Sequence, residues 1–150
     1  MNKIILLDST PLGLVSNPRG GGDNDACSAW MRGQLANGVP IAIPEIADYE
    51  VRRELLRAGK TRGIAKLDAL KTILDYLPLT TSTMLRAAEF WAQARRQGRP
   101  TANNLKLDAD VILAAQASLL LEEGYEAIVA TENVSHLALF VAADRWQNIA

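Results

Sequence analysis

The chain has 150 residues, an apolar fraction of 49%, a charged fraction of 22% and a formal net charge of -1. A chain of this length fits one hydrophobic core, so we expect a single domain over residues 1–150, and the composition excludes long disordered stretches. The near-neutral charge excludes nucleic-acid binding through overall positive potential, so any such contact must depend on local basic patches.

Three observations favour a cytoplasmic protein without a membrane segment. Asp8 interrupts the first apolar run before it reaches the length of a signal-peptide core. The longest apolar stretch, residues 111–121, is shorter than the roughly 20 residues that a membrane helix needs. The one cysteine, Cys27, can form neither an intrachain disulfide nor a cysteine zinc site, which suits a reducing compartment.

Short apolar runs alternate with helix-like segments along the chain. Residues 4–7 form a continuous apolar run, as expected for a strand covered on both faces of a parallel sheet. Further strands are predicted at residues 39–43, 78–80 and 126–131, and helices at residues 25–35, 44–58, 61–76, 81–97 and 108–123. This alternation predicts an α/β fold with three layers, α/β/α, and a mostly parallel central sheet of four to five strands.

Local turn chemistry marks several helix ends. Pro44 is expected at the first helical position, where its missing N–H is not needed. Thr81 or Ser82 is expected to cap the helix that follows, and Gly98 with Pro100 to close it.

In open parallel sheets, ligands bind beyond the carboxyl ends of the strands. Asp8 directly follows the first strand, and the turn Thr131-Glu132-Asn133 follows the last predicted one. A strand-ending aspartate either faces the crevice at this edge or caps the next helical turn, and the residues alone leave both alternatives open.

Two helices carry further candidate acids. Glu50 lies in PEIADYEVRREL, where an acid either points into the crevice or makes a solvated i to i+4 pair. Asp110 precedes the almost wholly apolar stretch VILAA, so its helix is expected to be buried. A carboxylate at the start of such a helix is a cap or a ligand. Asp108 is well placed to be the cap, so Asp110 is expected to have a role other than capping.

Two basic runs and one histidine each have two possible roles. His136, the sole histidine, is either an acid or base or a surface or capping residue. The basic residues either line an RNA channel or form solvated helix faces. They are Arg52, Arg53, Arg57, Lys60 and Arg62 in one run and Arg95, Arg96 and Arg99 in another.

In their order and spacing, these segments resemble the PIN-domain family, especially its bacterial VapC-like toxins. The resemblance spans nearly the whole chain and rests on four segments. They are the strand and acid in IILLDST, the helix in IPEIADYEVRREL, the helix in DVILAA and the strand and turn in IVATENVSHL.

The resemblance implies roles for individual residues. Asp8, Glu50 and Asp110 match the first, second and third acids of the family, and Ser9 matches the hydroxyl residue that commonly follows the first acid. His136 stands where a further Asp is common. The supporting positions are Thr131, Glu132, Asn133 and Asp108, and the last three are alternatives for the fourth ligand.

The resemblance also implies an activity. Clustered carboxylates repel one another unless a cation neutralises them, and hard oxygen ligands suit Mg2+ or Mn2+. We therefore expect a Mg2+- or Mn2+-dependent endoribonuclease that hydrolyses RNA with metal-activated water and leaves a 5'-phosphate and a 3'-hydroxyl. It would be the toxin of a type II toxin-antitoxin pair, with a short antitoxin protein as partner, and a homodimer. The alternative is a catalytically degenerate PIN-like domain that binds RNA or protein.

Overall fold

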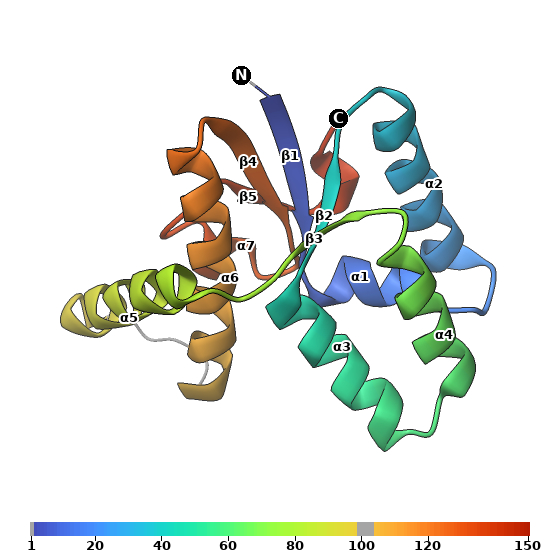
Figure 1. The fold of residues 1–150 in the computed structure, drawn as a ribbon, viewed down its shortest axis with the longest axis horizontal. Coiled ribbons are helices and arrows are strands. Elements are labelled where there is room, and N and C mark those ends of the chain that lie inside the picture. The colour runs from blue at the N-terminus through green and yellow to red at the C-terminus, as the bar shows by residue number, and fades with distance from the viewer. Residues whose placement is uncertain (1, 99–103) are drawn as a thin grey trace.

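A central parallel sheet organises the molecule. The computed structural model describes residues 2–98 and 104–150, and within them the sheet has five parallel strands in the order β3-β2-β1-β4-β5 (Figure 1). The strands are β1 (Asn2–Leu7), β2 (Ile41–Pro44), β3 (Asp75–Leu77), β4 (Tyr125–Ala130) and β5 (Ala143–Asp144). The predicted α/β fold with a sheet of four to five strands is confirmed.

Helices cover both faces of the sheet, which confirms the three layers (Figure 1). One face carries α1 (Ser9–Ser16), α2 (Gly22–Ala36), α4 (Thr61–Leu70) and the short 3-10 helix η1 (Trp146–Asn148). The other carries α6 (Asn104–Glu122) and α7 (Val134–Leu137), with α5 (Thr81–Arg96) packed against α6. The remaining helix, α3 (Glu45–Arg57), starts at the carboxyl end of β2 and contributes to both cores.

The central strand β1 shows why its sequence is continuously apolar. Ile5 and Leu7 lie in the core shared with α1 and α2, while Ile4 and Leu6 lie in the core shared with α6. Alternate side chains of a strand point to opposite faces, so a strand covered on both faces must be apolar at every position. The polar residue that follows, Asp8, is thereby placed at the carboxyl edge of the sheet.

The third strand was predicted wrongly at residues 78–80. Helix α4 ends at Leu70, and β3 pairs with β2 three residues earlier than expected, with Tyr76 opposite Ile43. Thr72 helps to end the helix, because its hydroxyl donates to the carbonyl of Ala69 at 2.7 Å and so competes with the helical pattern. Pairing of β3 with β2 therefore prevailed over the helical pattern of apolar residues in this segment.

Two helix starts also differ from the predictions. Pro44 is not the first helical residue: it ends β2 and precedes α3 with extended angles, φ -69° and ψ 137°. The cap of α5 is Thr80 rather than Thr81 or Ser82, since the Thr80 side chain accepts a hydrogen bond from the N–H of Thr83.

The sequence-based expectation also contains no helix at α1, although Asp8 caps one there. Pro11 falls in its first turn, where proline costs no helical hydrogen bond. Gly98 follows α5 with a φ of +62°, as the glycine stop predicts, while Arg99 and Pro100 lie outside the described residues.

Helix α6 is the most important correction, because it begins at Asn104 and not at Asp108. Asp108 therefore lies inside the helix and cannot cap it. Among the helices in the described parts of the chain, α6 included, none is long and apolar enough to cross a membrane.

Candidate active site

Asp8 occupies the junction between β1 and α1 and is only 4% exposed. One carboxylate oxygen, Oδ1, accepts a hydrogen bond from the backbone N–H of Ser9 at 2.7 Å. The other, Oδ2, accepts one from the hydroxyl of Thr131 at 2.7 Å, and that hydroxyl in turn accepts from the N–H of Asn133 at 2.9 Å. Asp8 thus caps α1 and is also bound to the turn after β4, so the two alternatives left open by its sequence are not exclusive.

Asp110 is buried at the same edge, from the opposite layer. It is 3% exposed and lies in the second turn of α6, beyond the reach of the free N–H groups that a cap would satisfy. Its Oδ1 lies 3.6 Å from Nζ of Lys106, one turn earlier, and its Oδ2 lies 3.4 Å from Nδ1 of His136. A capping role is excluded, and two basic side chains hold the carboxylate in place.

Glu50 approaches from α3. Its side chain is 14% exposed, and Oε2 lies 4.0 Å from the guanidinium of Arg53, at the outer limit of an ion pair. The interpretation of Glu50 as a solvated surface acid is wrong, since a surface pair would leave its carboxylate in water.

Charge interactions place the three acids in one group. Burial raises the pKa of Glu50, the charge of Asp8 raises it next, and the charge of Asp110 adds to the shift, while Lys106 and Arg53 oppose it. Burial also raises the pKa of Asp110, with Lys106 and His136 opposing and Asp8 adding to the shift. The charge of Asp8 therefore makes ionisation of both Glu50 and Asp110 less favourable, and the charge of Asp110 does the same to Glu50.

The carboxylate oxygens of the three acids are the type of ligand that a hard divalent cation prefers, although the side chains do not converge on a single position. Within residues 2–98 and 104–150, no three side chains of the Asp, Glu, His or Cys type are close enough to hold a metal ion as they stand. Three largely buried carboxylates that repel one another supply the oxygen ligands that Mg2+ and Mn2+ prefer. The metal and catalytic roles of Asp8, Glu50 and Asp110 stay predictions.

The supporting residues divide into two groups. Thr131 is 1% exposed and orients Asp8, and Ser9 does so through its backbone N–H. Glu132 instead pairs with Arg145, whose Nη2 lies 3.2 Å from Oε2, and Asn133 contacts Thr131 only through its backbone.

Asp108 faces away from the acids. It is exposed and lines a groove between α5 and α6 together with Met84 and Trp91. Two residues along a helix correspond to a rotation of about 200°, which puts Asp108 and Asp110 on opposite sides of α6. The groove position leaves no support for Asp108 as a cap or as a ligand.

Two residues next to Asp110 were not in the predicted site. Lys106 could have been found, since a spacing of four residues on a helix brings a lysine beside an aspartate. His136 follows the Thr131 turn, and only its position near the carboxyl end of β4 hinted that it would reach α6.

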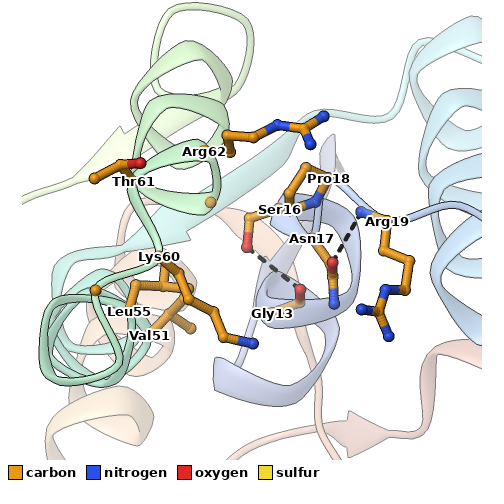
Figure 2. A pocket seen from close by; sticks show the side chains of 12 residues that line it. Gly13, Ser16, Asn17, Pro18, Arg19, Val51, Leu55, Lys60, Thr61 and Arg62 are labelled. Atoms are coloured by element: carbon orange, nitrogen blue, oxygen red, sulfur yellow. Dashed lines mark hydrogen bonds between the residues drawn. The ribbon is translucent and has the colours of Figure 1, made fainter.

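A cavity of about 600 Å³ lies apart from the acids, between the end of α1, α3 and the start of α4 (Figure 2). Its lining holds no Asp, Glu, His or Cys side chain, so it cannot supply the acidic chemistry. Three cations line it, Arg19, Lys60 and Arg62, and none has an ion pair among the residues that the structure describes. Val51, which follows Glu50 on α3, forms part of its wall, so α3 links the cavity to the acidic site.

Taken together, the chain is a three-layer α/β/α domain with buried acids gathered at the carboxyl edge of a five-stranded parallel sheet. Solved structures identify this fold more closely. VapBC2 from Rickettsia felis, bound to a DNA fragment from its promoter, is similar with a TM-score of 0.72 and 18% identity, over 95% of this chain and 98% of that chain. FitAcB from Neisseria gonorrhoeae is similar with a TM-score of 0.69 and 20% identity, over 97% and 99%.

A third structure is VapC20 from Mycobacterium tuberculosis, a toxin that cleaves the sarcin-ricin loop. It is similar with a TM-score of 0.59 and 17% identity, over 91% of this chain and 96% of that chain. No protein-family model matches the chain, and no curated protein matches it in sequence. The fold is therefore that of a VapC-like PIN domain, which confirms the resemblance seen in the sequence at the level of fold.

Proposed function

We propose that this chain is a Mg2+- or Mn2+-dependent endoribonuclease, with Asp8, Glu50 and Asp110 as the acids of its active site. The observation that carries the proposal is that three largely buried carboxylates come from three separate elements to one sheet edge, where the charge of Asp8 raises the pKa of both Glu50 and Asp110. Such an arrangement destabilises the fold unless a cation offsets the charge. Proteins retain unfavourable charge clusters of this kind mainly at functional sites.

The residues of this chain have distinct tasks in that reaction. Asp8 is held rigidly by Ser9 and Thr131, so its carboxylate is preorganised at the carboxyl end of β1. Glu50 and Asp110 approach it from the helices α3 and α6 and complete the set of oxygen donors. When bound, the divalent ion would activate water for attack on the phosphodiester and stabilise the developing negative charge.

RNA is the proposed substrate. Arg19, Lys60 and Arg62 around the cavity provide cations for backbone phosphates, which supply most of the affinity of proteins for nucleic acids. Their cavity lies at the far end of α1 from Asp8, which is about 12 Å for a helix of eight residues. An RNA strand cut at the acids could therefore be held by this basic cavity.

We further propose that the chain is the toxin of a type II toxin-antitoxin pair and forms a homodimer. The similar structures named VapBC support an antitoxin partner, a short protein that would dock near the acidic edge. Exposed apolar side chains on α5, Met84, Leu85 and Trp91, offer surface for a second subunit. Light scattering of the chain, alone and with the product of a neighbouring small reading frame, tests both partners.

A second candidate function is a degenerate domain that binds RNA or protein without cleaving. The contacts of Lys106 and His136 with Asp110 favour it, since they already offset part of the charge that a metal ion would offset.

Cleavage of a panel of structured RNAs in Mg2+, Mn2+ or chelator separates the two functions. The nuclease cleaves with metal only, and Asp8→Asn slows it by about a hundredfold or more, because a metal's charge stabilisation is worth several kcal/mol and about 1.4 kcal/mol is tenfold in rate. Glu54→Gln is the matched control, since Glu54 is an exposed acid of α3 paired with Arg57. RNA binding without cleavage, unchanged by chelator, would instead support the degenerate domain.

A further inference from the structure

Tyr49 is an exposed aromatic residue of α3 that directly precedes Glu50 in the chain. It is 56% exposed, and its ring takes no part in the hydrophobic cores of the described residues. The guanidinium of Arg53, one turn later on the same helix, lies over the ring at 5.0 Å from its centroid. The ring and the cation therefore form a pair on the solvent side of α3.

Arg53 connects this pair to the acidic site. Its side chain is 53% exposed, and its Nη2 lies 4.0 Å from Oε2 of Glu50. Burial raises the pKa of Glu50, and Arg53 is one of the cations whose charge opposes that shift. A single exposed apolar side chain is ordinary on a protein surface, but this ring lies under a cation that also reaches an acid of the proposed active site.

The helical positions place the pair on one side of Glu50 and the basic cavity on the other. Successive residues of an α-helix are rotated by about 100°, so Val51 in the cavity wall is about 100° from Glu50 in one sense, and Arg53 is about 60° from it in the other. The acid thus lies between the cavity and the pair. An RNA strand that runs from the cavity across the acids would next reach Tyr49 and Arg53.

We propose that Tyr49 and Arg53 form a stacking platform for an unpaired nucleobase of the RNA, next to the phosphate that is cut. The proposal rests on the proposed function, because it assumes that RNA crosses the acidic site. Unpaired bases stack on aromatic rings and on guanidinium planes, and the cation also attracts the neighbouring phosphate. A base inside a double helix is already stacked between its neighbours, so the platform selects single-stranded or looped RNA.

The test compares two ligands that carry the same charge. One is a labelled oligoadenylate of about 12 nucleotides, within the usual site sizes for single strands, and the other is an abasic ribose-phosphate chain of the same length. Fluorescence anisotropy measures the affinity of the full chain for each in chelator, where the proposed cleavage does not occur. We expect the wild type to bind oligoadenylate about tenfold more tightly, because stacking of one base on an aromatic ring changes affinity by about fivefold to a hundredfold.

Three variants locate the preference for bases. Tyr49→Leu keeps an apolar side chain but removes the ring, so it should bind the two ligands about equally. Tyr49→Phe keeps the ring and should retain the preference. Leu56→Ala removes another exposed apolar side chain of α3 and is the matched control that should also retain it.

The outcomes separate the platform from the function that it rests on. A preference for bases that survives in Tyr49→Leu, or that is absent from the wild type, would overturn the platform, whether or not the chain cleaves RNA. A lower mass of Tyr49→Leu in light scattering, with the preference unchanged, would overturn it by assigning Tyr49 to a protein contact. A preference lost only in Tyr49→Leu, in a chain that does not cleave RNA with Mg2+ or Mn2+, would support the platform and overturn the nuclease.

Discussion

Asp48 and Glu50 lie two residues apart on α3, yet their carboxylates have opposite surroundings. Asp48, 5% exposed, is fully matched: Nε of Arg52 lies 3.0 Å away, the Tyr76 hydroxyl donates to it at 2.7 Å, and Nζ of Lys71 lies 3.7 Å away. Glu50 faces the other way, towards Asp8 and Asp110, and its ion pair with Arg53, at 4.0 Å, is at the outer limit of distance.

The difference shows how burial of an acid can serve the fold or the site. The Asp48 group ties α3 to β3 and to the turn after α4, and Arg52 extends it to Asp68 of α4 at 2.8 Å. This anchoring fixes the rotation of α3 and so aims Glu50 at the sheet edge. The Asp48 ion pairs therefore position the helix, and the weakly paired Glu50 is the acid of α3 that we propose binds the metal ion.

Substitution of each acid by its amide tests this difference most strongly. Asp48→Asn removes the charge from a buried ion-pair group, and we expect the free energy of unfolding to fall by about 2 kcal/mol, since hydrogen bonds to charged groups are each worth about 1.5 to 3 kcal/mol and the partly exposed cations reduce that value. Urea unfolding in chelator measures it.

Glu50→Gln is the matched variant. Because burial and its neighbours raise the pKa of Glu50, its ionised form disfavours the folded state at neutral pH, and the amide should leave stability unchanged or increase it. Equal losses in Asp48→Asn and Glu50→Gln would remove the distinction between the two acids.

Cys27, buried in the core between α1 and α2, extends the comparison to an acid outside the carboxylate group. Burial, with the charge of Asp23, raises the pKa of its thiol to about 12 from a usual value of 9.0. A raised folded pKa means that the thiol's contribution is complete below pH 9 and is lost as the pH rises through the window from 9 to 12. Relative to Cys27→Ala, the free energy of unfolding of the wild type should fall by about 1.4 kcal/mol by pH 10.

Unfolding of the wild type and Cys27→Ala from pH 8 to 10.5 gives this difference, which cancels the titration of lysines and tyrosines common to both. A constant difference across that range would mean that the thiolate forms in the folded protein as easily as in the unfolded one.

The smallest expected effect concerns the cations of the cavity. Lys60→Met should weaken RNA binding in chelator and reduce the slope of log affinity against log salt by about 0.7, the value for one phosphate contact on a single strand. Arg57→Gln is the control, because Arg57 is already paired with Glu54 at 2.9 Å. The same change of slope in both variants would show that RNA does not distinguish the cavity from the rest of the basic run.

The sequence predicted the parts of the fold in which one periodicity dominates. The apolar runs of β1 and β4 and the apolar stretch after Asp110 have no competing interpretation, so the sheet edge and its first and third acids followed from them. Glu50 was harder, because a charged helix gives no sign of which acid turns inwards. Only the tertiary anchoring of Asp48 decides it.

The errors have equally specific causes. The position of β3 depends on its pairing with β2, which the spacing of apolar residues within the segment does not reveal. Helix α1 contains Pro11 and Gly13, residues that suggest a loop. Asp108 seemed a cap because the apolar part of α6 begins beside it, whereas the helix starts four residues earlier. The contact of His136 with Asp110 joins residues 26 positions apart and follows only from the fold.

Metal-linked stability tests the central claim most directly. The free energy of unfolding is measured with and without Mn2+ for the wild type, Asp48→Asn and Asp110→Asn. A ligand at about 100 times its Kd that binds only the folded state adds about 2.7 kcal/mol. We predict this gain for the wild type and for the weakened Asp48→Asn, and none for Asp110→Asn. An equal gain in all three variants, or no gain in the wild type, would contradict a metal site built from Asp8, Glu50 and Asp110.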